Sequence, residues 1–242
     1  MDTKDKLDYW YKKICVKEFI ALDPVQFPRR YKKREDIEIA AFLSAAIAWG
    51  RRDLILRSAE KIFALMGSSP FDYVMSGGCE KLKNNNIHRT FFESDLKYYC
   101  RGFRLCYAKY KNMEELFASR GNLWQAFDLF RREMADANKG VFSRHVSNPG
   151  GDGKTGSACK KLNLTLRWLA REGPVDLGLW KKIKPSSLYV PLDVHVSRAA
   201  RSLNLLKRKA NDKKSVIELT ENLREFCPED PVKYDFALFG MI

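Results

Sequence analysis

The chain has 242 residues, of which 45% are hydrophobic and 31% are charged, and its formal net charge is +14. This composition is typical of a folded globular protein and excludes a disordered one. No apolar run approaches the roughly 20 residues that span a bilayer. The first ten residues mix acids with lysines and lack the apolar core of a secretory signal, so a cytoplasmic protein that does not contact a membrane is expected.

Hydrophobic residues recur at helical spacing along almost the whole chain, and alternating runs typical of strands are nearly absent. We therefore predict an all-α protein without a β-sheet. The helices expected in the first half begin near Leu7 and then cover Ile37–Gly50, Arg51–Met66, Thr90–Tyr110 and Leu123–Asp136. The second of these is nearly uncharged, so Ile37–Trp49 is predicted to be central and buried. Gly67 is predicted to cap the C-terminus of the third.

A glycine-rich segment, residues 147–157, separates this half from the rest. Beyond it we predict helices over Ala158–Arg171, from an N-cap at Asp193, over Val216–Phe226, and from a final N-cap at Asp230 followed by proline. No linker is long enough to separate independent domains. The expected organisation is one domain of two interlocked helical halves, residues 1–146 and 158–242, joined by the loop 147–157.

Neither the cysteines nor the glycine-rich segment predicts a metal or a cofactor. The six cysteines are scattered and form no C-x-x-C pair, whereas zinc and iron–sulfur sites need several at short spacing. The segment GGDGKTG resembles a phosphate-binding loop, but the first glycine of that motif is replaced by Asn148 and no strand precedes it. We expect buried reduced thiols and no nucleotide site.

The positive charge is concentrated in one stretch. Residues 139–214 carry 17 Lys or Arg against 5 Asp or Glu, a net +12, whereas residues 215–242 have a net charge of −4. A local excess of cations is typical of proteins that bind nucleic-acid phosphates. The alternative is a solvated basic surface without a nucleic-acid partner.

The chain resembles an uncharacterised bacterial family catalogued as domain of unknown function 2400. The segments that carry this resemblance are DPVQFPRRY, IEIAAFLSAAIAWG, SACKKLNLTLRW, PLDVHVSR and DPVKYDFALFG. Together they cover nearly the full length. The family resemblance brings no established activity with it.

The C-terminal part is in turn similar to the helix-hairpin-helix (HhH-GPD) DNA glycosylase superfamily, most nearly to the archaeal 8-oxoguanine DNA glycosylases. The segment PLDVHVSR resembles their V/L-D-x-H/R-V-x-R block, which implies that Asp193 is the catalytic aspartate at the head of a helix. The resemblance also implies a catalytic lysine on an upstream helix. Lys160 and Lys161 are the candidates, and Lys160 is preferred. The common L-P-G-x-G hairpin is absent, and KIKPSSLYVP takes its place.

The chemistry of these residue types fits that resemblance. A carboxylate can stabilise the positive charge that develops on a sugar when its base leaves, and an unprotonated amine can attack the sugar carbon. Arg167 would lie near Lys160 on the same helix. If both groups act, the carboxylate and the amine should lie within roughly 3–7 Å of each other. Otherwise Asp193 is only a helix cap and Lys160 only a solvated lysine.

The resemblance implies a base-excision DNA glycosylase, with or without lyase activity, that acts on a flipped damaged base such as an oxidised purine. Its expected partner is duplex DNA, and a monomer is expected. Candidate DNA-contacting residues are the cations that bracket Asp193 and one in the glycine-rich loop: Lys154, Lys181, Lys182, Lys184 and Arg198. His195 is expected to be buried and hydrogen-bonded, and Trp49, Trp168 and Trp180 are expected to pack in the core.

Two other functions remain open at this point. The first is a DNA- or RNA-binding protein that keeps the fold and the charge without catalysis. The second is a helical scaffold whose charge serves acidic protein partners. A lysine and Asp193 retained in one pocket would separate the enzyme from the non-catalytic binding protein. Salt-sensitive binding to duplex DNA would separate both of these from the scaffold.

Overall fold

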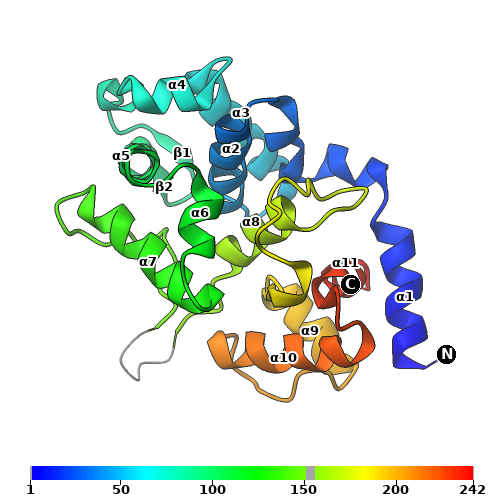
Figure 1. Ribbon diagram of the computed structural model, residues 1–242. Coiled ribbons are helices and arrows are strands. Elements are labelled where there is room, and N and C mark those ends of the chain that lie inside the picture. Colours follow the sequence, from blue (N-terminus) through cyan, green and yellow to red (C-terminus); the bar gives the residue numbers. More distant parts are fainter. Residues whose placement is uncertain (1, 151–155, 242) are drawn as a thin grey trace. The chain divides into compact units, whose positions relative to one another are not determined.

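The prediction of a helical protein is confirmed by a computed structural model, which describes residues 2–150 and 156–241 (Figure 1). The chain divides into two compact units. One comprises residues 1–21 and 147–242, and the other comprises residues 22–146. The boundary between residues 146 and 147 coincides with the end of the predicted N-terminal half. The first 21 residues, however, belong with the C-terminal segment, which corrects their predicted assignment to the N-terminal half.

The first unit, built from both ends of the chain, consists of helices joined by irregular segments among its described residues. Its α-helices are α1 (Thr3–Ile14), α8 (Lys160–Ala170), α9 (Val194–Ser202), α10 (Lys213–Phe226) and α11 (Tyr234–Gly240). Its short 3-10 helices are η5 (Pro185–Ser187) and η6 (Pro231–Lys233), and η1 (Lys17–Leu22) follows α1. Helix α1 packs along α11, as Figure 1 shows in blue and red.

Hydrophobic burial explains why α1 joins the C-terminal segment. Leu7 of α1 is fully buried, and the rings of Tyr11 and Phe236 approach to 6.4 Å between centroids. Phe236, from α11, also contacts Phe19 at 5.6 Å. Both helices are too short to be stable alone, and each buries apolar side chains of the other.

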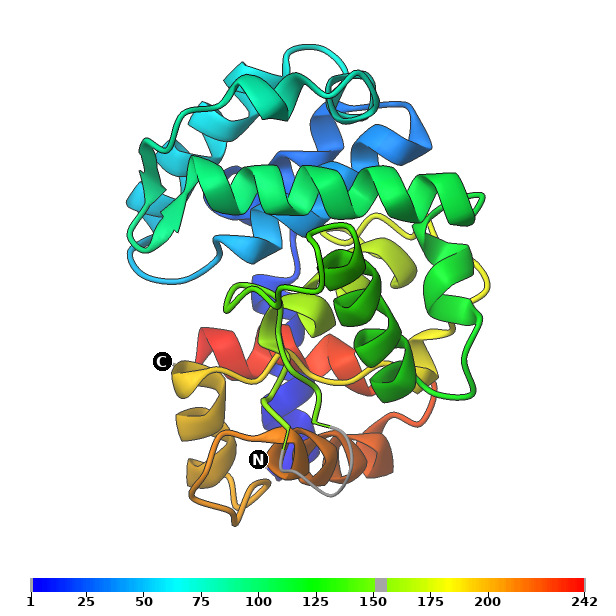
Figure 2. The same ribbon diagram turned by 90° about the vertical axis from the view of Figure 1, so that its left-hand side faces the viewer.

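The second unit contains the longest helix and the only strands of the described chain. Its α-helices are α2 (Arg34–Ala46), α3 (Arg52–Met66), α4 (Pro70–Met75), α5 (Glu93–Lys109), α6 (Met113–Ala118) and α7 (Leu123–Asp136). It also has η2 (Pro24–Gln26), η3 (Pro28–Arg30), η4 (Gly78–Lys81), β1 (Asn86–His88) and β2 (Phe91–Phe92). Helix α5 is viewed end-on in Figure 1 and along its length in Figure 2.

Most of the nearly uncharged segment Ile37–Trp49 is buried, as predicted, and its first ten residues belong to α2. Every residue from 38 to 47 is buried, and the Phe42 ring contacts Phe103, Phe117 and Phe130 at centroid distances of 5.1–5.8 Å. The buried stretch ends before Trp49, which is half-buried. Gly67, with φ of +67°, caps α3 as predicted.

The prediction of no β-sheet is corrected by a two-stranded antiparallel hairpin of β1 and β2. Arg89 makes its turn at a φ of +52°, a conformation more typical of glycine or asparagine. His88 anchors β1, because its Nδ1 lies 3.0 Å from Ser58 Oγ on α3 and its Nε2 lies 2.8 Å from the carbonyl of Trp49. Because these contacts with distant residues hold the hairpin, its short strands do not need the alternating hydrophobic pattern from which strands are predicted.

Among the described residues, no helix combines the length and the apolar character that crossing a membrane would require. Five of the six cysteines are buried, and Cys227 is half-buried.

Candidate functional site

The N-terminal end of α8 carries the preferred lysine. Lys160 is the first residue of this helix, and Cys159 before it adopts a left-handed conformation with φ of +47°. Such a backbone is strained for a residue other than glycine and persists only where its surroundings enforce it. Asn163 contributes, because its side chain donates to the carbonyl of Ala158 at 3.0 Å. A lysine is also electrostatically unfavourable at a helix N-terminus, so this position departs from what helix stability alone would select.

The chain just before α8 is held by backbone contacts. The amide of Ser157 donates to the carbonyl of Asn148 at 2.9 Å, and the carbonyl of Gly156 accepts from the amide of Lys213 at 3.0 Å. A Cβ on Gly156 would lie 1.9 Å from the carbonyl oxygen of Pro149, so only glycine fits there. These contacts fix the entry of α8 and therefore the position of Lys160.

Asp193 begins α9 as its predicted N-cap. One carboxylate oxygen, Oδ1, accepts from the amides of His195 and Val196, both at 2.9 Å. This geometry satisfies two of the amides that a helix start leaves without carbonyl partners. Because Oδ1 binds the helix, the other oxygen is turned to a different partner.

That partner is Lys160. Its Nζ lies 3.0 Å from Asp193 Oδ2, and the two side chains are 30% and 24% exposed. The separation lies at the short end of the predicted range. Both residues belong to the first unit, so two helix starts 33 positions apart in sequence bring an amine and a carboxylate together at a partly open position. Lys161, the neighbouring candidate, is not part of this ion pair.

The carboxyl group of Asp193 is kept ionised. Burial alone would raise its pKa, but the positive charge of Lys160, the amide of Val196 and the hydrogen bond from Lys160 outweigh that effect and lower the pKa below its usual value. His195 adds a smaller effect in the same direction. The site therefore holds a stable carboxylate beside an amine.

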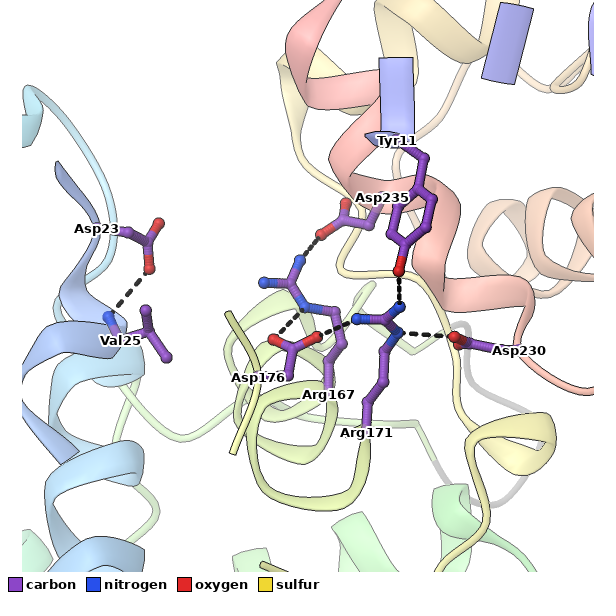
Figure 3. Close-up of polar contacts among 8 residues, drawn as sticks. All are labelled: Tyr11, Asp23, Val25, Arg167, Arg171, Asp176, Asp230 and Asp235. Atoms are coloured by element: carbon purple, nitrogen blue, oxygen red, sulfur yellow. Dashed lines mark hydrogen bonds and ion pairs between the residues drawn. The ribbon is translucent and has the colours of Figure 1, made fainter. Parts of the chain in front are cut away.

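Two buried arginines lie at the C-terminal end of α8, Arg167 in its last turn and Arg171 as its C-cap. Arg167 and Arg171 are 4% and 2% exposed. Arg167 contacts Asp235 of α11, and its Nε lies 3.3 Å from Asp176 Oδ1 (Figure 3). The ring of Phe236 packs 4.1 Å from the Arg167 guanidinium. Because cations are costly to bury, each needs a carboxylate and hydrogen bonds in the interior.

Arg171 completes this buried ion network. It contacts Asp176 and Asp230 at 2.8 Å each and the hydroxyl of Tyr11 at 2.7 Å (Figure 3). Burial opposes the charged form of Arg171, but Asp176 and Asp230 more than compensate and raise its pKa. Asp230 was predicted to cap the last helix; instead, its carboxylate binds Arg171, and proline opens η6.

Asp235 is the network member with an unusual proton affinity. Burial raises its pKa to about 6, while Arg167 opposes the shift. Asp193 raises the pKa further, Lys160 lowers it, and Asp176 raises it. Asp235 is thus electrostatically coupled to the Lys160–Asp193 pair.

Sequence reasoning missed Asp235, although a signal was present. It is an acid in the otherwise apolar helix YDFALFG, and Arg167 is likewise the lone charge within LNLTLRWLA. A charge on a buried helical face calls for a partner on another element.

Of the candidate DNA-contacting cations, Arg198 lies on α9, whereas Lys181, Lys182 and Lys184 precede that helix in the sequence. Lys182, Lys184 and Arg198 are exposed. Lys181 is also exposed, and its ammonium lies 3.3 Å from Glu172, which competes with a phosphate for it. Lys154 falls outside the described residues.

Of the other sequence predictions for this region, one is wrong and others are confirmed. His195 is exposed, which corrects the expectation that it is buried. Trp168 and Trp180 are buried, as expected for core residues. Within residues 2–150 and 156–241, no group of three or more His, Cys, Asp or Glu side chains is arranged to hold a metal ion.

Comparison with known proteins places the chain in a family. A family model described as a protein of unknown function (DUF2400) matches residues 23–242, which is nearly the whole chain. Neither a functionally curated protein nor a solved structure matches. The matched region includes Lys160, Asp193 and the five charged residues of the buried ion network. The chain belongs to the DUF2400 family.

Proposed function

We propose that the protein is a base-excision DNA glycosylase with an associated lyase step, acting on a damaged base in duplex DNA. The observation that carries the proposal is the pair of Lys160 and Asp193, with 3.0 Å between amine and carboxylate at a partly exposed position. An oxidised purine such as 8-oxoguanine is the substrate class suggested by the resemblance of PLDVHVSR to the archaeal enzymes. Bound DNA would reach the pair through the exposed cations around α9.

Lys160 and Asp193 would have complementary roles in this reaction. The carboxylate of Asp193 stabilises the positive charge that forms at C1′ as the bond to the base breaks. The ammonium group of Lys160 gives one proton to the departing base, and the amine that this leaves bonds to C1′. A second proton then passes from the lysine nitrogen to O4′ as the C1′–O4′ bond breaks and the sugar ring opens. The resulting iminium is the intermediate that borohydride reduces to a stable adduct. The low pKa of Asp193 suits a charge stabiliser better than a proton acceptor.

The test is incubation with a panel of oligonucleotide duplexes, each with one defined lesion, in the presence of borohydride. We expect one lesion class to yield a covalent protein–DNA adduct. Lys160→Gln should abolish the adduct, whereas the matched control Lys161→Gln, one residue away on the same helix, should retain it. Asp193→Asn should slow base release about 10²–10³-fold, as expected for the loss of a transition-state charge partner, with DNA affinity nearly unchanged.

A full panel without any adduct or base release would contradict the proposal. An adduct that survives in Lys160→Gln and disappears in Lys161→Gln would transfer the role to Lys161.

A second candidate is a nucleic-acid-binding protein without catalysis. It is favoured by the occupation of both carboxylate oxygens of Asp193, with Oδ1 on the α9 amides and Oδ2 on Lys160. Such an arrangement serves to join α8 to α9 even without a reaction. This alternative would be established by salt-dependent binding to duplex DNA, together with no adduct and no base release for any lesion in the panel.

A further inference from the structure

The loop between α9 and α10 carries a cluster of positive charge apart from the cations considered so far (Figure 1). Residues 207–214, with the sequence KRKANDKK, include five Lys or Arg and a single Asp. The side chains of Lys207, Lys209 and Lys214 are exposed, and Arg208 is half-buried. We call residues 207–214 the basic loop. They belong to the first unit, as do α8 and α9.

The basic loop is braced by side chains of the two helices that flank it. The guanidinium group of Arg201, in the last turn of α9, donates to the carbonyls of Arg208 and Lys209 at 2.9 and 2.8 Å. From α10, the hydroxyl of Ser215 donates to the carbonyl of Ala210 at 2.5 Å. Because these contacts use backbone carbonyls, they order the loop without occupying its lysine ammonium groups. A loop that is ordered in advance loses less entropy when it binds a partner.

The basic loop is also joined to the chain that enters α8. The amide of Lys213 donates to the carbonyl of Gly156 at 3.0 Å, and Ser157 pairs with Asp212 in an antiparallel bridge. Gly156 lies four residues before Lys160, a span of at most about 14 Å even for an extended chain. Along a duplex this span corresponds to about four base pairs. A duplex with a damaged nucleotide at Lys160 is therefore long enough to contact the basic loop at the same time.

Helix stability alone does not explain the charges of the basic loop. Lys213 and Lys214 are the first two residues of α10, where the helix dipole disfavours cations. The start of α10 is already capped by Asp212, which accepts from the amide of Ser215 at 3.0 Å and binds Arg208 at 2.8 Å. An anion would thus bind the exposed lysine side chains and not the helix end itself. Its negative charge would also reduce the repulsion among the cations of the loop.

We propose that the basic loop is a DNA-binding surface, which holds the phosphate backbone of a duplex beside the candidate site in addition to Lys182, Lys184 and Arg198. Lysines bind phosphates without regard to base sequence, so the contact holds the duplex in place and does not select the lesion. The choice of duplex DNA as the partner rests on the proposed function. The contact itself can be measured with undamaged DNA, independently of any reaction.

The test is the salt dependence of binding to an undamaged, fluorescein-labelled duplex of about 20 base pairs, measured by fluorescence anisotropy. Lys207→Ala combined with Lys209→Ala should flatten the log–log salt slope by up to about 2, because each phosphate contact releases roughly one counterion. The double variant keeps the backbone carbonyls that brace the loop, so its thermal unfolding should match wild type.

The matched control is Lys4→Ala combined with Lys6→Ala. It removes the same charge from exposed positions on α1 in the same unit, and its salt slope should equal that of wild type. A wild-type slope in the Lys207 and Lys209 double variant, or an equal change in the α1 control, would overturn the inference.

Polyglutamate is the probe for an acidic protein partner. It should compete weakly with the duplex, because its carboxylates do not have the spacing of a phosphate backbone. If the Lys207 and Lys209 double variant lost binding to polyglutamate and kept the wild-type slope for DNA, the basic loop would belong to an acidic protein partner. That result would also overturn the inference.

Borohydride trapping with the lesion panel separates this inference from the proposed function. If the double variant has the flatter slope and wild type traps no lesion, the DNA-binding surface stands and the lyase proposal fails. If wild type traps a lesion and the double variant keeps the wild-type slope, the lyase proposal stands and the inference fails.

Discussion

The two ends of α8 present the same chemical pairing in opposite settings. At the N-terminal end, Lys160 meets Asp193 with both side chains about a quarter to a third exposed. In the C-terminal half, Arg167 and Arg171 bind three aspartates while almost fully buried. An ion pair near solvent contributes little to stability, whereas a buried one leaves a costly lone charge when a partner is removed. One end of the helix can therefore be used for chemistry, and the other maintains the fold.

The largest expected effect is on stability and lies at the buried end. Arg167→Met should lower the free energy of unfolding by about 3–5 kcal/mol, because Asp235 and Asp176 lose a buried cation. Lys160→Met on the same helix should cost less than about 1 kcal/mol. Denaturant unfolding measures both. Equal losses at the two positions would remove the distinction between the ends of α8.

The next effect concerns the pH dependence of Asp235. Its pKa is raised from 3.8 to about 6 in the folded protein, so the folded state holds this proton more tightly than the unfolded state. The contribution of Asp235 to stability therefore decreases as pH rises from about 4 to about 6 and stays constant above that.

The difference in unfolding free energy between wild type and Asp235→Asn isolates this contribution. As pH rises from about 4 to about 6, this difference should change by up to about 3 kcal/mol, and the wild type should lose stability relative to Asp235→Asn. Urea unfolding at pH 4, 5, 6 and 7.5 measures it. A difference independent of pH would show that Asp235 titrates normally.

A smaller effect separates the two uses of Asp193. Asp193→Ala should cost about 1 kcal/mol through loss of the helix cap, while Asp193→Asn keeps the cap and loses the ion pair. Because the pKa of Asp193 is lowered in the folded state, the advantage of wild type over Asp193→Asn should be fully present above the unfolded value of about 3.8 and disappear as pH falls through the folded value. Thermal unfolding of the three proteins at pH 3 and pH 7 tests this.

The smallest effect on stability is expected for residues outside α8. Replacing Lys182 and Lys184 together by Ala should change the unfolding free energy by no more than about 0.5 kcal/mol. If wild type contacts about four phosphates, its log–log salt slope for duplex binding should be roughly −3 to −4, and the double variant should flatten it by up to about 2. An unchanged slope would place the DNA-contacting surface elsewhere.

Much of the candidate site could be predicted from local sequence. Asp193 is followed by an amphipathic helix and has the short polar side chain that caps such helices, so its N-cap role depends only on its neighbours. Lys160 follows a glycine-rich segment at the start of a predicted helix. Their meeting could be expected only from the resemblance of PLDVHVSR to known enzymes, because no local rule connects positions 33 residues apart.

The remaining residues were hidden because their roles depend on distant partners. Asp230 has the sequence of a helix cap, yet Arg171 binds its carboxylate at 2.8 Å. Arg167 was expected to be a cation near Lys160, but Asp176 and Asp235 compensate its charge. His195, expected to be buried, is exposed because its position in the first turn of α9 faces away from the stripe of Val196 and Ala199.

The sequence by itself determined the helical class, most helix positions, and the capping of α3 by Gly67 and of α9 by Asp193. These follow from periodicity and capping, which act over a few residues. Only the tertiary structure decided that α1 packs on α11, that Lys160 rather than Lys161 meets Asp193, and that Asp235 pairs with Arg167. Those outcomes depend on which apolar faces and which buried charges find each other across the fold, and burial makes each such match energetically decisive.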